Sequence, residues 1–202
     1  YEELQNTIDK YVNDYPDVFT YLPLEQNGGL GNALRYGLTY CRNGLIGRMD
    51  TDDIAKPDRC QKQLQYMLDN SSVAIIGGQI EEFIDYPDNV VGKRIVPLTN
   101  TELQLYLKQR CPFNHMTVMF RKSDVKSVDS YQDWFWNEDY YLWLRMALAK
   151  KKFANLKDVL VSVRVGRDMY SRRGGPKYFK SEIKLQNYML RNRLIGLPTY
   201  LS

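Results

Sequence analysis

The stretch from Leu45 to Arg59 constrains the fold and the chemistry more than any other part of the chain. A short apolar run ends there in three carboxylates among four residues, Asp50, Asp52 and Asp53. An apolar run of about five residues is typical of a buried strand. The carboxylates are therefore predicted at the carboxyl end of a strand, which is the edge of an open α/β sheet where ligands bind.

Three carboxylates this close together repel one another, and a divalent cation is the simplest way to offset the repulsion. Mg²⁺ and Mn²⁺ suit such oxygen ligands, because they use one or two protein carboxylates and take the rest from water and substrate phosphates. A nucleotide diphosphate is thus predicted as a ligand. The alternative is a Thr/Asp cap on a helix with Pro57 in its first turn. A cap needs only one carboxylate and leaves the others unexplained.

Composition places the chain among ordinary globular proteins. Its 202 residues are 44% hydrophobic and 26% charged, which favours one α/β domain. Three widely spaced cysteines fit neither a disulfide framework nor a zinc site and indicate a reducing compartment. No apolar run approaches the roughly 18 residues of a membrane span, and no signal-peptide pattern is present. We therefore expect a cytoplasmic protein.

Periodicity predicts alternating helices and strands. Helices are expected over residues 2–14, 32–41, 57–68, 99–110, 140–150 and 177–195. Strands are expected over residues 18–22, about 45–49, 73–77, 79–85, 93–96, 116–121, 153–156 and 159–165. Thr99 and Glu102 form a capping box for the fourth helix. The alternation in the first part of the chain favours a parallel sheet.

Two loops could contact a ligand. The glycines of residues 25–31 either let backbone amides approach a phosphate or form an ordinary tight turn. Residues 130–139 concentrate aromatic and acidic side chains, Trp136 among them. These rings form either a small satellite core or a platform on which a sugar or base stacks.

Glu138 and Asp139 follow the aromatic residues at the start of a predicted helix. The helix dipole alone favours acids there. A second acidic cluster also suggests a division of labour, in which one cluster holds a metal and a diphosphate while another carboxylate removes a proton from a nucleophile. His115 is the only histidine, which excludes His-rich metal sites, and a lone histidine beside a strand is more often a hydrogen-bonded structural residue.

Four segments in order, residues 27–38, 47–59, 114–123 and 137–145, resemble glycosyltransferase family 2, especially bacterial enzymes that build extracellular and surface polysaccharides. The resemblance covers about residues 15 to 173. It implies a GT-A fold, with a mixed central sheet flanked by helices and with a nucleotide half and an acceptor half. It also implies a nucleotide-diphosphate sugar donor, Mg or Mn, a glycan or lipid-linked acceptor, and inversion at the transferred sugar.

The resemblance assigns roles to particular residues. Asp50 and Asp52 match the Asp-x-Asp motif, with Asp50 near the ribose and donor and Asp52 as ligand of the metal. Asp139 matches the catalytic base, and Glu138 beside it would orient acceptor or donor. His115 falls in the segment that lines the acceptor side.

A basic loop near the carboxyl end carries Arg172 and Arg173, which either pair with the donor diphosphate or belong to a solvated surface. The family often has Arg where this chain has Leu34, so a phosphate contact at that position is not expected.

Family members open with a strand, a helix and a second strand that hold the base, and this sequence starts after them. We therefore expect one N-terminally incomplete GT-A domain that ends in a basic amphipathic helix at 177–195. That helix either rests on anionic lipid or packs on the sheet.

Two other functions remain to be weighed. A non-catalytic nucleotide-sugar or glycan-binding module could keep the fold.

Nine Lys or Arg residues against two acids between Arg164 and Arg193 make the C-terminal part basic. Nucleic-acid binding by this part is nevertheless disfavoured, because it would leave both acidic clusters unfavourably placed.

Overall fold

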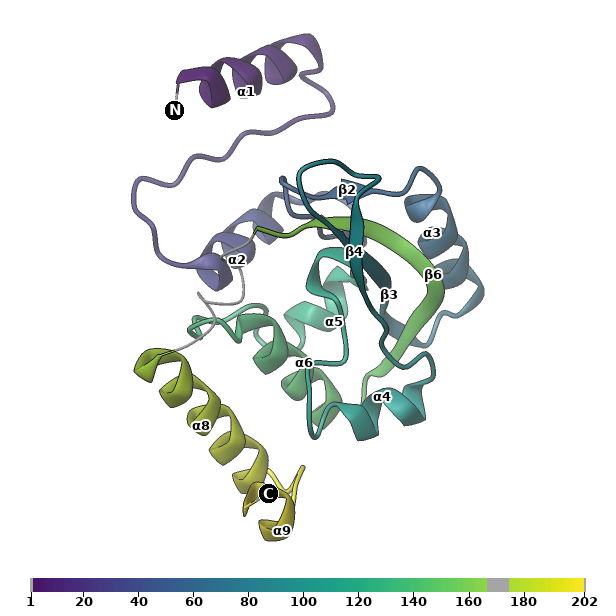
Figure 1. Cartoon of the computed structure of the whole chain (residues 1–202), viewed down its shortest axis with the longest axis vertical. Coiled ribbons are helices and arrows are strands. Elements are labelled where there is room, and N and C mark those ends of the chain that lie inside the picture. Colours follow the sequence, from purple (N-terminus) through teal and green to yellow (C-terminus); the bar gives the residue numbers. More distant parts are fainter. Residues whose placement is uncertain (1, 167–174, 202) are drawn as a thin grey trace.

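A mixed six-stranded sheet forms the centre of the protein (Figure 1). The computed structural model describes residues 2–166 and 175–201. Within them the strands follow the order β1-β5-β3-β6-β2, and β4 pairs with the outer part of β3. The strands are β1 Leu45–Gly47, β2 Ile54–Ala55, β3 Val73–Phe83, β4 Val90–Arg94, β5 Met119–Arg121 and β6 Lys152–Arg164.

Only β3 and β6 run parallel, and the other four strand pairs are antiparallel. This confirms the mixed sheet. The parallel sheet expected from helix–strand alternation was wrong for every strand pair but one. In the other four pairs, the connections bring the second strand back in the opposite direction.

Helices surround the sheet and extend from it (Figure 1). The helical segments are α1 Glu2–Asp14, α2 Leu30–Tyr40, α3 Arg59–Asp69, α4 Asn100–Tyr106, η1 His115–Thr117, α5 Lys122–Lys126, α6 Glu138–Leu148, α8 Pro176–Arg191 and α9 Leu197–Leu201. Helix α1 buries none of its residues. In the described part of the chain, no helix combines the length and the apolar composition needed to cross a membrane.

The core lies on both faces of β3, whose neighbouring residues point in opposite directions. Ile75 packs with Trp143 of α6 and Phe153 of β6, and all three are buried. Ile76 packs on the other face with Met67 of α3. Because both faces are covered, the first part of β3, residues 73–76, is a continuous apolar run rather than an alternating one.

Two glycines let β3 and β6 continue past the points where sequence patterns predicted breaks. A Cβ on Gly77 would lie 2.5 Å from Oδ1 of Asn155, and a Cβ on Gly78 would lie 2.5 Å from Cδ1 of Leu160. The close approach keeps the strands paired through register shifts at this point. The predicted strands 73–77 and 79–85 are therefore one strand, and so are 153–156 and 159–165.

The strand predicted over residues 18–22 was wrong. The segment is irregular, with Val18 73% and Phe19 45% exposed. No described strand pairs with it, and an unpaired strand has no ladder of hydrogen bonds to stabilise it.

The other predicted elements are present with shifted ends. The capping box is confirmed, because the Thr99 hydroxyl accepts from the Glu102 amide and Glu102 accepts from the Thr99 amide at 3.1 Å. Helix α4 nevertheless ends at Tyr106 rather than 110, and α8 ends at Arg191 rather than 195. The segment 116–121 is a short 3-10 turn followed by β5.

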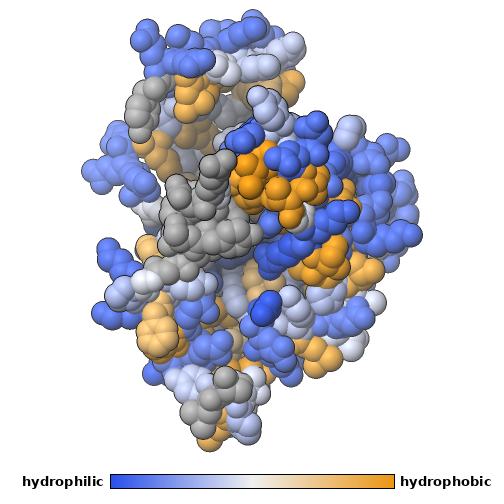
Figure 2. Space-filling model, in the orientation of Figure 1, coloured by the Kyte–Doolittle hydropathy of each residue, from blue (hydrophilic) through white to orange (hydrophobic). Residues whose placement is uncertain are grey.

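The surface seen in Figure 2 is mostly hydrophilic, and apolar side chains gather on it near β4. Val90 and Val91 of that strand are 41% and 52% exposed.

Candidate functional site

The acidic loop, residues 48–53, starts beside the segment that carries His115. Strand β1 pairs antiparallel with β5, with Gly47 opposite Met119. The residue after β1 therefore lies beside the residue before β5, and the Arg48 amide donates to the carbonyl of Val118 at 2.9 Å. The topology thus brings two distant parts of the sequence to one place.

The three carboxylates of the acidic loop have different surroundings. Arg48 donates to both oxygens of Asp50, at 2.5 and 2.6 Å. Asp53 accepts from the amide of Arg164 at 3.0 Å. Burial raises the pKa of Asp53 to about 6, and the charges of Asp50 and Asp52 add to the rise. Asp52 is exposed and makes no hydrogen bond or ion pair with any described residue.

The acid pair, Glu138 and Asp139, forms the first turn of α6. Glu138 is buried, and burial raises its pKa to about 7, with the charge of Asp139 adding to the rise. A carboxyl group with such a pKa holds a proton part of the time at neutral pH. One oxygen of Asp139 accepts from the Tyr140 amide at 2.7 Å.

The second oxygen of Asp139 faces His115 and Cys111. It lies 3.9 Å from Nδ1 of His115 and accepts from Sγ of Cys111 at 3.6 Å. Burial lowers the pKa of His115 to about 4, so the ring is neutral at pH 7. Its Nε2 lies 3.0 Å from the hydroxyl of Tyr131. His115 is thus a hydrogen-bonded residue, as the sequence suggested, and it also contacts the predicted base.

Arg48 is the first residue of the acidic loop, and its charge also reaches the acid pair. Its side chain is 7% exposed and is bound to Asp50, and its charge opposes the effect of burial on the pKa of Glu138. The buried Nε of Arg48 has no hydrogen-bond partner among the described residues. Sequence reasoning missed this residue, although a basic residue directly between a strand and an acidic loop was a usable signal.

The aromatic loop, residues 130–139, has one ring in the core and two at the surface. Trp134 is 7% exposed and packs on Tyr141, with ring centroids 4.2 Å apart. Phe135 and Trp136 are 49% and 46% exposed. The first ring therefore belongs to the core, and the other two lie at the surface, where Trp136 can contact a ligand.

The glycines before α2 meet the aromatic loop. A Cβ on Gly31 would lie 2.6 Å from the carbonyl oxygen of Gln132 and 3.1 Å from Cβ of Glu138. Gly29 has φ of 86°. Close packing and a turn therefore account for these two glycines.

The predicted charge partners Arg172 and Arg173 lie outside the described residues.

The carboxylates of the acidic loop are oxygen ligands of the kind that a divalent metal binds. The described residues contain no group of three or more His, Cys, Asp or Glu side chains arranged to hold an ion. Mg²⁺ and Mn²⁺ at nucleotide sites need only one or two carboxylates, because substrate phosphates and water complete the coordination. The carboxylates of Asp52 and Asp50 match that number and that type of ligand.

The mixed sheet and the helices around it form a GT-A fold, a fold of glycosyltransferases. The fold agrees with solved structures. A Staphylococcus aureus TarS structure superposes with a TM-score of 0.62 over 90% of this chain, at 15% identity. The mannosyltransferase PcManGT from Pyrobaculum calidifontis, solved with GDP-Man and Mn²⁺, superposes with a TM-score of 0.59 over 98%, at 14% identity. The chain spans 52% and 60% of those two solved chains.

The chain belongs to glycosyl transferase family 2, whose sequence profile matches residues 2–128. It is 41% identical to the amylovoran biosynthesis glycosyltransferase AmsE of Erwinia amylovora over 96% of this chain and 72% of that protein. It is 36% identical to an Escherichia coli enzyme named UDP-Gal:alpha-D-GlcNAc-diphosphoundecaprenol beta-1,3-galactosyltransferase, over 98% of this chain and 71% of that protein.

Proposed function

We propose that this chain carries out an inverting hexosyl transfer from a nucleotide-diphosphate sugar to a hydroxyl of a lipid-linked glycan, in bacterial polysaccharide or surface-glycan synthesis. The observation that carries the proposal is the β1–β5 pairing, which brings the acidic loop beside the segment of His115, whose Nδ1 lies 3.9 Å from Asp139. The arrangement supports a donor at the acidic loop and a proton acceptor at Asp139. The name of the Escherichia coli relative supports an acceptor whose first sugar is joined to a lipid through a diphosphate.

The acidic loop is the proposed donor side. Asp52, exposed and without a described partner, is the first metal ligand, and Asp50 is the second ligand and the contact to the ribose. Arg48 orients Asp50 by binding both of its oxygens. A bound Mg²⁺ or Mn²⁺ would supply positive charge to the leaving diphosphate.

The acid pair is the proposed acceptor side. Asp139 takes the proton of the acceptor hydroxyl. At the same time the oxygen of that hydroxyl forms a bond to the anomeric carbon of the donor sugar. The bond from that carbon to the diphosphate oxygen breaks, and the electron pair leaves with the nucleotide. Attack from the face opposite the leaving group inverts the configuration.

Neighbouring residues support the acid pair. Neutral His115 lies beside one carboxylate oxygen of Asp139, and the Tyr140 amide donates a hydrogen bond to the other. Glu138, buried beside it, orients donor or acceptor, and the exposed ring of Trp136 stacks on a sugar. Arg172 and Arg173 are proposed to contact the diphosphate on sequence grounds alone.

We place the reaction at the cytoplasmic face of the membrane. The first turn of α8 carries exposed Lys177, and Phe179 in the same turn is 66% exposed. A basic helix with an exposed ring near its start suits a peripheral contact with anionic lipid.

Donor binding can be tested by thermal unfolding with a panel of UDP and GDP sugars, with and without Mn²⁺. A true donor at 100 times its Kd stabilises the folded state by about 2.7 kcal/mol. We expect one donor to raise the Tm in the presence of Mn²⁺ and to release nucleoside diphosphate when an acceptor is added. Asp52→Asn should abolish the Mn²⁺-dependent part of the shift.

The matched control is Asp69→Asn at the exposed end of α3, where the carboxylate contacts only Gln65 among the described residues. It should behave as the unchanged chain does. A shift without turnover would favour the non-catalytic binding module, and the absence of any shift would contradict the proposal.

A further inference from the structure

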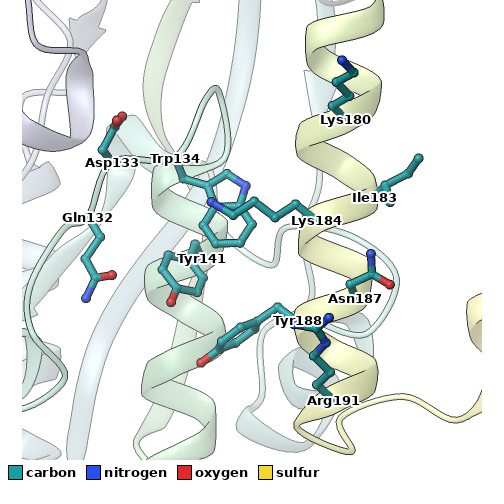
Figure 3. A pocket seen from close by; sticks show the side chains of 10 residues that line it. All are labelled: Gln132, Asp133, Trp134, Tyr141, Lys180, Ile183, Lys184, Asn187, Tyr188 and Arg191. Carbon is teal, nitrogen blue, oxygen red and sulfur yellow. The ribbon is translucent and has the colours of Figure 1, made fainter.

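A pocket of about 460 Å³ lies between α6, α8 and the aromatic loop, and no described residue of the acidic loop lines it (Figure 3). This α6/α8 pocket lies within the size range of small-ligand sites. Its lining residues are Gln132, Asp133, Trp134, Tyr141, Lys180, Ile183, Lys184, Asn187, Tyr188 and Arg191.

Aromatic rings form one wall of the α6/α8 pocket. Trp134 and Tyr141 lie with ring centroids 4.2 Å apart, and Tyr188 meets Tyr141 at 4.9 Å with its ring nearly perpendicular. Figure 3 shows Tyr188 reaching from α8 toward Tyr141 on α6. Trp134 is 7% exposed and stacks on Tyr141, so the partly exposed rings of Tyr141 and Tyr188 are the part of this wall that a ligand can reach. Flat apolar rings of this kind cover the face of a pyranose and leave its hydroxyls free to hydrogen-bond.

Cations line the other wall. Lys180, Lys184 and Arg191 all come from α8, and none forms an ion pair with a carboxylate of the described residues. Lys184 extends across the pocket, with Nζ 3.9 Å from the centroid of the Trp134 ring (Figure 3). Unpaired ammonium and guanidinium groups beside a hollow favour a ligand with phosphate oxygens.

The α6/α8 pocket is attached to the loop that precedes the acid pair. Asp133 of that loop is the one carboxylate among the described residues of the pocket lining. Asn137 donates to Glu182 of α8 at 2.7 Å, and Ser181 donates to the carbonyl of Phe135 at 2.6 Å. These bonds fix α8 to the loop that leads directly into Asp139.

We propose that the α6/α8 pocket binds the diphosphate and the first sugar of the lipid-linked acceptor. Lys180, Lys184 and Arg191 receive the phosphate oxygens, and the ring of the sugar lies against the aromatic wall. The inference rests on the proposed function, which places the diphosphate of the donor at the acidic loop. A second anion site therefore serves the other substrate, and the hydrogen bonds between α8 and the loop before α6 hold this site beside the end of α6 that carries Asp139.

The test measures binding by calorimetry, with N-acetylglucosamine α-diphosphate esterified to a short alkyl chain as the probe and N-acetylglucosamine methyl glycoside as the uncharged comparison. The variant is Lys180→Gln/Lys184→Gln/Arg191→Gln. The matched control, Lys10→Gln/Lys108→Gln/Lys126→Gln, removes three exposed lysines outside the pocket. Cooperative thermal unfolding of each variant is the check that it folds.

We expect the pocket variant to bind the diphosphate probe at least about tenfold more weakly, which corresponds to about 1.4 kcal/mol, because it loses three charge-assisted hydrogen bonds. The control should stay within about twofold, and Asp139→Asn, which removes the proposed base, should still bind the probe. Unchanged binding in the pocket variant would overturn the inference.

Two further outcomes are decisive. If the pocket variant instead loses only its binding to phosphatidylglycerol vesicles, the cations serve a membrane and the inference is overturned. Probe binding that depends on the pocket, in a chain that transfers no sugar, would support the pocket and reject the proposed function.

Discussion

Arg48 binds both carboxylate oxygens of Asp50, at 2.5 and 2.6 Å, from a side chain that is 7% exposed. A bidentate pair fixes the orientation of the carboxylate as well as its charge. Because the same guanidinium also acts on Glu138, it links the proposed donor side to the proposed acceptor side.

The pair should be energetically coupled. Removing one partner leaves the other charge without compensation, and Asp50 is 34% exposed, so solvent screens part of the effect. We expect a coupling energy of about 1 kcal/mol between Arg48→Met and Asp50→Asn in a double-mutant cycle of urea unfolding. Additive single effects would show that Arg48 does not hold Asp50 in solution.

Glu138→Gln should change how stability depends on pH. The folded-state pKa of Glu138 is raised from 4.5 to about 7, so its contribution is fully present below pH 4.5 and is lost as pH rises through 7. Glutamine cannot ionise. The free energy of unfolding of the variant, relative to the parent, should therefore rise by about 2 kcal/mol between pH 5 and pH 8.

Glu3→Gln, at an exposed position of α1, is the control for this measurement and should give no such slope. A constant difference between Glu138→Gln and the parent at both pH values would mean that Glu138 does not have the raised pKa.

Local sequence signals predicted the helices well, because their causes lie within a few residues. Thr99 and Glu102 complete their capping box without any contact from elsewhere. The segment 18–22 has a strand's composition, yet pairing depends on a partner that sequence patterns do not reveal. Continuation of β3 through Gly77 likewise depends on close approach to Asn155, which is 78 positions away in the chain.

Gly31→Ala should displace the aromatic loop. The added Cβ would lie 2.6 Å from a backbone oxygen, that of Gln132, which has little freedom to move away. Overpacking of this kind destabilises by about 1–3 kcal/mol. Chemical unfolding measures the loss, and the proposed transfer should slow because the loop leads into the acid pair.

Gly37→Ala tests the same change in the same helix, where a Cβ meets nothing within 4 Å. Alanine is the better helix former, so this variant should gain up to about 1 kcal/mol. If both variants lose equal stability, contact with Gln132 is not the reason for a glycine at position 31.

The candidate site was only partly accessible from sequence. Asp52 and Asp139 were predicted from acid clusters and a family resemblance, and their roles remain predictions. The role of Arg48 was missed, because its place beside Val118 follows from the β1–β5 pairing. Cys111 was missed as a neighbour of Asp139 because the two are 28 positions apart.

The most direct test of the central claim compares Asp139→Asn with the parent at saturating donor and acceptor, with Asp69→Asn as control. Loss of a general base lowers turnover by about 10²–10⁴-fold. We predict a loss in that range for Asp139→Asn alone, with an unchanged donor-dependent Tm shift. Turnover within a few-fold of the parent would contradict the claim that Asp139 removes the proton of the acceptor.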